Sequence, residues 1–331
     1  MIRTLAIDDF HPLLREALEA AGLVYINMDG IDQAGARTLP EHEVLLVRSK
    51  IQIDADWLDA HPFVKFIARG GAGLDNIDEA ACALRGVKVV HAGGANSDAV
   101  GEQAAGMLLA LTHRIASADR EVRGGLWRRE ANRGIELTGR TVGILGYGHT
   151  GRAFARRIAA FGTRNLAYDK YLVHYGDGSA IEATPEQLFA EAEILSLHIP
   201  LTDETRFMVN ADYLSRFQRL RYLLNLSRGE IVRTCDVVAA LESGKLEGFA
   251  ADVLEVEPPQ RATAEYQTCF EQLFASPKTV LTPHVGGWTA ESYERISAFL
   301  AQRILAELQP YANLPEPLLD YLKIWENLRP C

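Results

Sequence analysis

Short apolar runs alternate with longer amphipathic runs along most of the chain. Within the first hundred residues the apolar runs have the length of buried strands, and they are Thr4–Ile7, Val44–Val47, Val64–Ala68 and Val87–Val90. Amphipathic runs such as Pro12–Ala21 lie between them and have helical spacing. This alternation is typical of an α/β fold with a parallel sheet, because parallel neighbours need a crossover connection.

A second series of strands follows, and it is predicted at Val142–Leu145, Asn165–Tyr168, Ile194–His198, Tyr222–Leu226, Gly248–Asp252 and Thr279–Pro283. Ser97 is expected to cap one long helix that reaches about Val122, and Ala290–Leu308 forms another. The second helix can cross back to the first series. We therefore predict one domain from residues 1–98 plus 292–331 and another from residues 99–291. Residues 309–331 hold a short acidic, helix-like piece between prolines, to which we assign no function.

Composition narrows the class of protein. A length of 331 residues suits about two domains. Hydrophobic residues at 48% and charged residues at 24% exclude disordered, collagen-like and coiled-coil chains. The net charge of −10 opposes nonspecific binding to nucleic acid. No apolar stretch reaches the roughly 20 residues of a membrane span, and the first residues lack a signal core. We expect a soluble, cytoplasmic protein that does not bind membranes.

The four cysteines are Cys82, Cys235, Cys269 and Cys331. None forms a CxxC pair, and no Cys/His cluster has zinc spacing. We expect four free thiols in a reducing compartment and no metal site.

A glycine motif suggests a dinucleotide site. Gly146, Gly148 and Gly151 match GxGxxG, with His149 and Thr150 between the last two. The motif follows a predicted strand and opens a predicted helix. The first glycine permits a tight turn, the second lets the backbone approach a pyrophosphate, and the third allows close packing of helix and strand. The helix N-terminus then offers N–H groups and a positive dipole end to the phosphates.

Asp169 ends the next predicted strand, close to the spacing of about 20 residues expected for a ribose-binding acid. A carboxylate there accepts both ribose hydroxyls and repels a 2′-phosphate. We therefore predict NAD rather than NADP as the cofactor. Other Rossmann folds, such as methyltransferases, also combine a glycine loop with an acid, so this pair alone does not define the reaction.

Three chemically active side chains follow three successive strands. Arg228, Glu257 and His284 each come after an apolar run. In a doubly wound sheet the carboxyl ends of the strands gather at the ligand crevice, so these side chains are expected to converge there. Taken singly, each has a plain structural explanation, such as a surface ion pair or a turn residue. Three together, downstream of a dinucleotide loop, indicate hydride-transfer chemistry.

At these residues the chain resembles the D-isomer-specific 2-hydroxyacid dehydrogenase family. The resemblance covers about residues 45 to 310 and rests on LGYGHTG, LAYD, LSLHIPLTDET, LNLSRGEIV, AADVLEVEP and LTPHVGG. It implies two Rossmann-like, doubly wound parallel-sheet domains with a cleft between them. The first would bind the substrate and the second would bind NAD, and the chain would form a homodimer.

The resemblance also implies catalytic roles. Arg228 would bind the substrate carboxylate and polarise the C2 oxygen. His284 would take the hydroxyl proton during oxidation and return it during reduction, while Glu257 would hold the imidazole and stabilise its protonated form. The chemistry agrees, because histidine suits proton transfer near neutral pH and arginine suits bidentate carboxylate binding.

The same resemblance implies further contacts with the cofactor. Asp252 would lie by the nicotinamide, and His198 and Pro200 would line the adenosine side. The remaining cofactor residues in these motifs are Leu226, Ser227, Gly286 and Gly287.

Residues of the first predicted domain indicate which 2-hydroxy acid is the substrate. Arg48 and Ser49 follow a predicted strand, and Arg69 precedes the glycine loop Gly71, Ala72 and Gly73, whose N–H groups can receive a carboxylate. These stretches resemble the phosphoglycerate dehydrogenase branch of the family, in a short form without a regulatory domain. Arg48, Lys50, Arg69 and Asn96 would then face a phosphate of the substrate or the group next to it. Lys50 is better explained as a solvated lysine, and Arg69 is equally explained as a structural residue.

Three features depart from that branch. Gly70 stands where alanine is frequent, Trp288 follows Gly287 where a small residue is usual, and Pro259–Phe274 lengthens the segment before His284. A bulky ring near the cofactor would narrow or shield the site.

We therefore predict NAD-dependent oxidation of 3-phospho-D-glycerate to 3-phosphohydroxypyruvate, the first step of serine synthesis. One alternative keeps the chemistry and changes the acid, as in a glyoxylate/hydroxypyruvate reductase or a D-lactate-type dehydrogenase. Another is a dinucleotide-sensing, corepressor-like scaffold, in which partner binding matters more than turnover.

Overall fold

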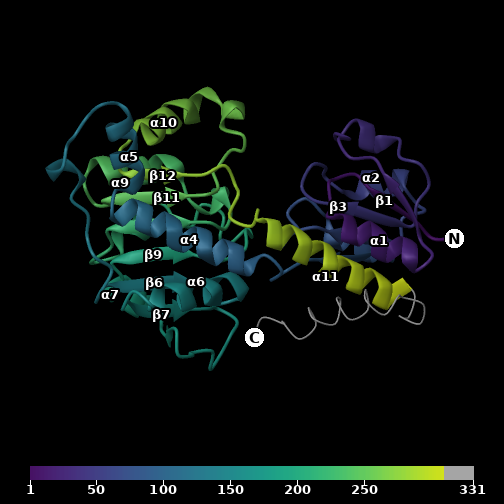
Figure 1. The fold of residues 1–331 in the computed structure, drawn as a ribbon, viewed down its shortest axis with the longest axis horizontal. Helices are drawn as coiled ribbons and strands as arrows, with labels where there is room; N and C mark the ends of the chain where they lie inside the picture. The colour runs from purple at the N-terminus through teal and green to yellow at the C-terminus, as the bar shows by residue number, and fades with distance from the viewer. Residues whose placement is uncertain (309–331) are drawn as a thin grey trace. The chain divides into compact units, whose positions relative to one another are not determined.

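The computed structural model describes residues 1–308, and the chain divides into two compact units (Figure 1). One unit contains Met1–Asn96 together with Trp288–Leu308, and the other contains Ser97–Gly287. The predicted domain boundaries differ from the boundaries of these units by a few residues at both places where the chain passes from one unit to the other. The predicted helix-like piece within 309–331, and Cys331, lie outside the described residues.

The first unit is built on a parallel sheet of five strands in the order β2-β1-β3-β4-β5. The strands are β1 (Arg3–Ala6), β2 (Val24–Asn27), β3 (Val44–Val47), β4 (Phe66–Arg69) and β5 (Lys88–His91). The helices are α1 (Pro12–Ala20), α2 (Ala55–Ala60), α3 (Glu79–Leu84) and α11 (Ala290–Leu308), with a 3₁₀ turn at Gly35–Arg37. The sequence missed β2, an edge strand whose side chains stay partly exposed.

The last helix packs into the core of this first unit. Leu14 and Leu18 of α1 share a hydrophobic cluster with Ile296, Leu300 and Ile304 of α11. Apolar residues three and four positions apart lie on one face of a helix. The two ends of the chain therefore build one core.

The second unit is built on a parallel sheet of seven strands in the order β12-β11-β10-β9-β6-β7-β8. The strands are β6 (Thr141–Leu145), β7 (Arg164–Tyr168), β8 (Ile181–Glu182), β9 (Ile194–Leu197), β10 (Tyr222–Asn225), β11 (Gly248–Ala251) and β12 (Thr279–Leu281). The helices are α4 (Ser97–Thr112), α5 (Ile115–Arg123), α6 (His149–Ala159), α7 (Pro185–Glu191), α8 (Ala211–Ser215), α9 (Thr234–Glu242) and α10 (Ala264–Ala275), with 3₁₀ turns at Glu130–Asn132, Gly229–Ile231 and Pro259–Arg261.

Both faces of this second sheet are covered. Leu223 of β10 belongs to one hydrophobic cluster, and its neighbour Leu224 belongs to another. Successive side chains of a strand point to opposite faces, so each face has its own core. The central strands are buried along their whole length, as expected for a parallel sheet between two helical layers. This arrangement confirms the predicted α/β, doubly wound class.

The predicted helix from Ser97 to about Val122 is wrong in its continuity. It is two helices, and Arg114 between them has φ 55°, in the left-handed region. The N–H of Ile135 donates to the carbonyl of Thr112 at 3.0 Å, and a Cβ on Gly134 would lie 2.6 Å from the same oxygen. A distant loop therefore takes the carbonyl group at the helix end, which sequence periodicity cannot indicate.

The expectation of four free thiols is also wrong. Cys235 of α9 and Cys269 of α10 form a disulfide, with Cα atoms 5.2 Å apart. The two residues are far apart in sequence, and only the packing of α10 on α9 brings them together. Cys82 is a buried free thiol, and burial raises its pKa.

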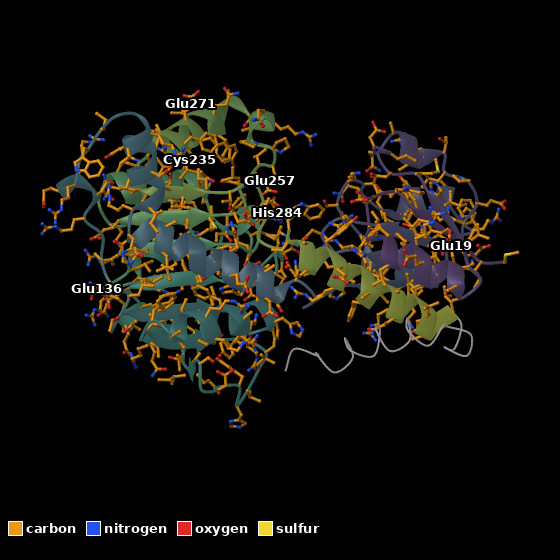
Figure 2. All side chains as sticks on the ribbon, in the orientation of Figure 1. Glu19, Glu136, Cys235, Glu257, Glu271 and His284 are labelled. Carbon is orange, nitrogen blue, oxygen red and sulfur yellow. A yellow bond between two sulfur atoms is a disulfide. The ribbon has the colours of Figure 1, made fainter. Side chains whose placement is uncertain are left out.

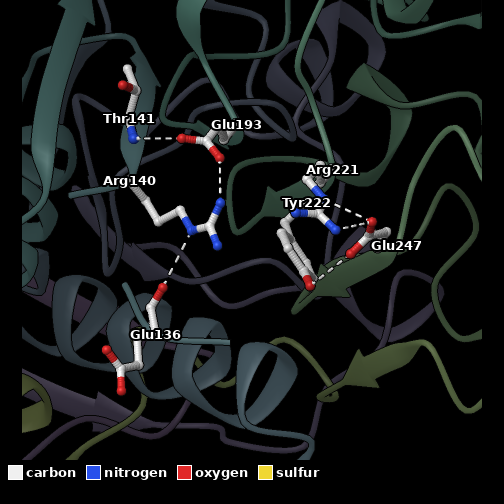
Figure 3. Close-up of polar contacts among 7 residues, drawn as sticks. All are labelled: Glu136, Arg140, Thr141, Glu193, Arg221, Tyr222 and Glu247. Carbon is white, nitrogen blue, oxygen red and sulfur yellow. Dashed lines mark hydrogen bonds and ion pairs between the residues drawn. The ribbon is translucent and has the colours of Figure 1, made fainter. Parts of the chain in front are cut away.

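Ion pairs join the residues that precede the central strands of the second unit (Figure 3). Nη1 of Arg140 lies 2.6 Å from Oε2 of Glu193, and Nε of Arg221 lies 2.7 Å from Oε1 of Glu247. Burial would raise the pKa of Glu193, but the Arg140 hydrogen bond lowers it below its usual value. These ion pairs therefore connect neighbouring strands at the end of the sheet where the strands begin. No helix within residues 1–308 is both long and apolar enough to cross a bilayer.

Candidate active site

The glycine loop has the geometry of a phosphate cradle. Gly146 has φ +90°, and a Cβ there would collide with the carbonyl oxygen of His198. At Gly148 a Cβ would meet no protein atom within 4 Å, so space is free in front of this residue. The 11-residue helix α6 begins at His149, with Thr150 beside it in the first turn. This open backbone at a helix N-terminus fits the pyrophosphate of a dinucleotide.

Asp169 is fixed directly after β7. Its Oδ2 accepts the N–H of Tyr147 from the glycine loop at 2.8 Å. Its Oδ1 accepts the N–H groups of Tyr171 and Leu172 at 2.9 and 3.1 Å. The carboxylate is therefore held by three backbone donors, of which one belongs to the glycine loop. Each carboxylate oxygen accepts more than one hydrogen bond, so both can still receive ribose hydroxyls.

Two of the three predicted catalytic side chains are in direct contact. Nδ1 of His284 lies 2.7 Å from Oε2 of Glu257 (Figure 2). Glu257 belongs to the loop after β11, and His284 follows β12, its neighbour in the sheet. His284 has φ 56°, a left-handed conformation that is uncommon for a non-glycine residue. An N–H on Nδ1 that donates to Glu257 leaves Nε2 unprotonated and able to act as a base.

Glu257 is itself held by the chain. Its Oε1 accepts the N–H of Leu254 at 2.8 Å. Burial would raise the pKa of Glu257, but the hydrogen bond and charge of His284, with smaller contributions from Leu254 and Arg228, lower it below its usual value. The side chain therefore remains a carboxylate, which favours a fixed orientation of the imidazole.

Asp252 anchors the segment that carries His284. This buried carboxylate accepts the hydroxyl of Thr282 at 2.5 Å and the N–H groups of Val285 and Gly286 at 2.9 and 2.7 Å. The N–H of His284 donates to the backbone carbonyl of Asp252 at 2.7 Å. The sequence expectation placed Asp252 beside the nicotinamide, whereas these contacts also make it the support of the histidine loop.

Arg228 is held by close packing of two loops. A Cβ on the next residue, Gly229, would collide with the carbonyl of Leu254, so only glycine allows this approach. Nδ2 of Asn225 donates to the carbonyl of Arg228 at 2.9 Å, and Nη1 of Arg228 donates to the carbonyl of Ser227 at 2.7 Å. Arg228 therefore follows β10 at the same edge of the sheet as Glu257 and His284.

The other predicted cofactor residues have mainly structural contacts. The ring of His198 packs on Phe154 and shares a hydrogen bond of 2.8 Å with Oγ of Ser196. Burial lowers the pKa of His198 to about 3, so it is neutral at physiological pH. Ser227 donates to the carbonyl of Leu197 at 2.8 Å and joins the ends of β9 and β10. Leu226, Pro200 and Gly287 remain partly or fully accessible, while Gly286 is buried.

The predicted substrate residues lie in the first unit. Arg48 follows β3, Arg69 ends β4, and Gly71, Ala72 and Gly73 form the next loop. Ser49 is exposed, and Oδ1 of Asn96 is buried without a hydrogen-bond partner in the described part of the chain.

Two details of the substrate expectation change. The N–H of Gly71 is already bonded to the carbonyl of Arg69 at 3.0 Å. Lys50 is paired with Asp8 and Asp29 at 3.2 and 2.8 Å, so these contacts support a structural role for it.

Several residues around these sites were missed by the sequence analysis. They are Thr282, Asn225 and Leu254 in the second unit and Asp8, Phe10 and Tyr293 in the first. Thr282, Asn225 and Leu254 stand inside the motifs quoted for the family, but no role was assigned to them there. Asp8, Phe10 and Tyr293 lie outside every motif. Only Trp288 gave a signal in the sequence, because its bulky ring stands where a small residue is usual.

The parallel sheet, the glycine loop and the His284–Glu257 pair define an NAD-binding α/β oxidoreductase. The model of the D-isomer specific 2-hydroxyacid dehydrogenase NAD-binding domain matches residues 105–286. The chain belongs to this family, as the sequence motifs predict, and NAD is its cofactor.

Relatives and solved structures agree on the family. A hydroxypyruvate reductase from Thermotoga maritima is 36% identical over 278 residues, which cover 82% of this chain and 87% of that one. A D-3-phosphoglycerate dehydrogenase from Mycobacterium leprae is 36% identical over 281 residues, which cover 84% of this chain and 51% of that one. The crystal structure of the TT0316 protein from Thermus thermophilus has a TM-score of 0.82 and 30% identity, covering 95% of this chain and 99% of that one.

Proposed function

We propose that this protein interconverts a D-2-hydroxy acid and its 2-oxo acid, with Arg228, His284 and Glu257 as the reacting set. The observation that carries the proposal is the 2.7 Å contact between His284 and Glu257 beside Arg228 at one sheet edge. NAD, when bound, exchanges a hydride with C2 of the acid. The glycine loop and Asp169 would hold its pyrophosphate and ribose.

The chain's own groups would handle the substrate and the proton. Arg228 binds the C1 carboxylate and polarises the C2 oxygen through its planar donors. During oxidation, Nε2 of His284 accepts the hydroxyl proton, and during reduction it returns this proton to the C2 oxygen. Glu257 keeps Nδ1 protonated and the ring oriented, so the reactive nitrogen is always Nε2.

For the acid itself we propose 3-phospho-D-glycerate, with 3-phosphohydroxypyruvate as the oxidised product. Arg48 supports this choice, since Nε and Nη2 of its guanidinium are buried without a hydrogen-bond partner among the described residues. A phosphate offers the charge and the acceptors that these donors lack. The 36% identity to a D-3-phosphoglycerate dehydrogenase agrees with the choice.

Hydroxypyruvate or glyoxylate is the second candidate. A hydroxypyruvate reductase is equally similar, at 36%, and matches this chain over more of its own length. A glyoxylate reductase from Thermofilum pendens is 33% identical over 295 residues.

An initial-rate panel with NADH separates these candidates. The 2-oxo acids are phosphohydroxypyruvate, hydroxypyruvate, glyoxylate, pyruvate and 2-oxoglutarate. We expect kcat/KM for phosphohydroxypyruvate to exceed the others at least about a hundredfold, equivalent to about 2.7 kcal/mol of transition-state discrimination. Preference for an unphosphorylated acid would move the function to the second candidate.

Removal of the proposed base tests whether this is an enzyme at all. His284→Ala should lower kcat about 10³-fold and leave the Kd of NADH, measured by fluorescence titration, unchanged within about twofold. Retention of most of the rate would contradict the mechanism. Binding of NADH without turnover of any acid by the unmutated protein would favour the corepressor-like alternative.

We also propose that the chain forms a homodimer through α5 and the loop that follows it. Ile115, Val122, Leu126 and Trp127 are 55%, 52%, 49% and 85% exposed. Apolar side chains gathered in one segment are typical of an interface. Light scattering coupled to size exclusion should give twice the chain mass, and Trp127→Ser should shift the protein towards the monomer. A monomeric unmutated protein would contradict this proposal.

A further inference from the structure

Three aromatic rings of the first unit surround one arginine. The guanidinium carbon of Arg48 lies 4.5 Å from the ring centre of Trp288 and 5.4 Å from those of Phe10 and Tyr293. Arginine stacks favourably on aromatic faces, most strongly on tryptophan. The faces of the three rings therefore cover the guanidinium of Arg48.

The three rings differ in how firmly they are held. Phe10 is buried, and the hydroxyl of Tyr293 donates to Asp9 at 2.6 Å. Trp288 is 58% exposed, and no hydrogen bond is recorded for its indole within residues 1–308. Trp288 is therefore the ring that can shift without disturbing the core.

The nearby carboxylates are occupied by other groups. Asp8 accepts the backbone N–H of Arg48 at 2.5 Å and pairs with Lys50 at 3.2 Å. Asp9 accepts the Tyr293 hydroxyl. Within the described part of the chain, the Arg48 guanidinium forms no ion pair.

Part of the guanidinium is unsatisfied as well. Nε and Nη2 of Arg48 form its side-on fork, and both are buried with no hydrogen-bond partner among residues 1–308. A buried donor without a partner keeps the full penalty of its desolvation. Burial lowers the pKa of Arg48, and the charge of Asp8 opposes that effect. A buried fork without an acceptor in the free protein points to an acceptor supplied by a ligand.

Gly70 explains why the arginine can occupy this position. A Cβ on Gly70 would lie 2.6 Å from the Phe10 ring and 3.2 Å from Cγ of Arg48. Gly70 stands where alanine is frequent in the family branch, and its lack of a side chain therefore makes room for Phe10 and Arg48. Gly70 and Trp288, two of the three features that depart from the family branch, therefore both lie against Arg48.

We propose that Trp288 is a positioning residue that sets substrate specificity through Arg48. Its ring keeps the guanidinium covered, and it shifts to admit an oxyanion of the substrate other than the C1 carboxylate. The ligand class is thus a 2-oxo or 2-hydroxy acid with a second anionic group, either a phosphate or a carboxylate. This inference rests on the dehydrogenase function proposed above and adds the residue that selects the acid.

Paired substrates test the inference. Phosphohydroxypyruvate and hydroxypyruvate differ only by the phosphate, and 2-oxoglutarate compared with 2-oxobutyrate tests a distal carboxylate. Trp288→Ser should raise KM about tenfold or more for the preferred anionic acid while kcat and the KM of its neutral counterpart stay within about twofold. Trp288→Phe should restore most of the difference, because a ring face remains. Arg48→Lys should behave like Trp288→Ser, because lysine keeps the charge but loses the fork.

The control is Arg37→Lys, since Arg37 is an exposed arginine of the same unit. This variant should leave the KM of both substrates of a pair unchanged. Equal KM changes for both members of a pair, or no change in either, would overturn the role of Trp288. Loss of turnover in the unmutated enzyme for every acid would instead refute the proposed function. In that case a direct readout remains: 3-phosphoglycerate should bind the unmutated protein, by calorimetry, at least about ten times more tightly than Trp288→Ser. Equal affinities, or no binding by either protein, would overturn the inference.

Discussion

His284 and Glu257 come from loops after adjacent strands, and their Nδ1 and Oε2 atoms lie 2.7 Å apart. The contact depends on two further anchors, since Asp252 holds the histidine loop and the Leu254 N–H holds Glu257. The pair is thus fixed from both sides before any ligand arrives. If His284 is the base that we propose, this prearrangement leaves little reorganisation for the moment of proton transfer.

Glu257→Gln should lower kcat about 10- to 100-fold, a smaller loss than removal of His284, because glutamine keeps the shape but loses the charge that orients the ring. The Kd of NADH should stay unchanged. Steady-state rates and fluorescence titration give both values. Glu193→Gln is the matched control, since that carboxylate serves the opposite edge of the sheet (Figure 3). It should lower stability and leave kcat within about twofold, and an equal loss of kcat in both variants would show that Glu257 has only a structural role.

Asp169→Asn should admit NADP. The neutral amide no longer repels a 2′-phosphate, while the Tyr147 N–H can still donate to its oxygen. We expect the ratio of kcat/KM for NAD over NADP to fall at least about tenfold. Asp203→Asn, an exposed acid of the same unit, is the control and should leave the ratio unchanged. Equal use of both cofactors by the unmutated enzyme would refute the ribose assignment.

Reduction of the Cys235–Cys269 disulfide should destabilise the second unit. The bridge spans 34 residues, and chain-entropy estimates for a loop of that length give about 3–4 kcal/mol. Urea unfolding with and without a dithiol reductant measures the difference. In the Cys235→Ser/Cys269→Ser variant the reductant should have no effect. An unmutated protein whose unfolding is equally insensitive to the reductant would contradict the disulfide.

Acid should destabilise the fold through His198. Its pKa is lowered to about 3 in the folded protein, against 6.5 in the unfolded chain. The unfolded state therefore binds the extra proton between these values, so stability is full above pH 6.5 and falls as the pH drops towards 3. The slope from one proton is about 1.4 kcal/mol per pH unit. His198→Gln, compared by urea unfolding at pH 7, 6 and 5, should lose that part of the slope, whereas an identical slope in both proteins would contradict the lowered pKa.

The family and the second unit were predictable because their signals are local. The glycine spacing, the acid after the next strand and the strand-end residues Arg228, Glu257 and His284 are all short-range patterns. A parallel sheet turns such patterns into a site, since it brings successive carboxyl ends to one edge. The break at Arg114 was missed because a loop distant in sequence decides where the helix ends. The edge strand β2 was missed because its side chains are partly exposed.

The sequence by itself determined the α/β class, the glycine loop that we propose to bind NAD and the identity of the proposed reacting groups, since each depends on periodicity or on the spacing of residues near one another in the chain. Only the tertiary structure decided what holds those groups. It paired Cys235 with Cys269, assigned Lys50 to Asp8 and Asp29, and gathered Phe10, Trp288 and Tyr293 around Arg48. The physical reason is that packing and pairing depend on distances between residues that are remote in sequence, and these distances are fixed only when the hydrophobic cores close.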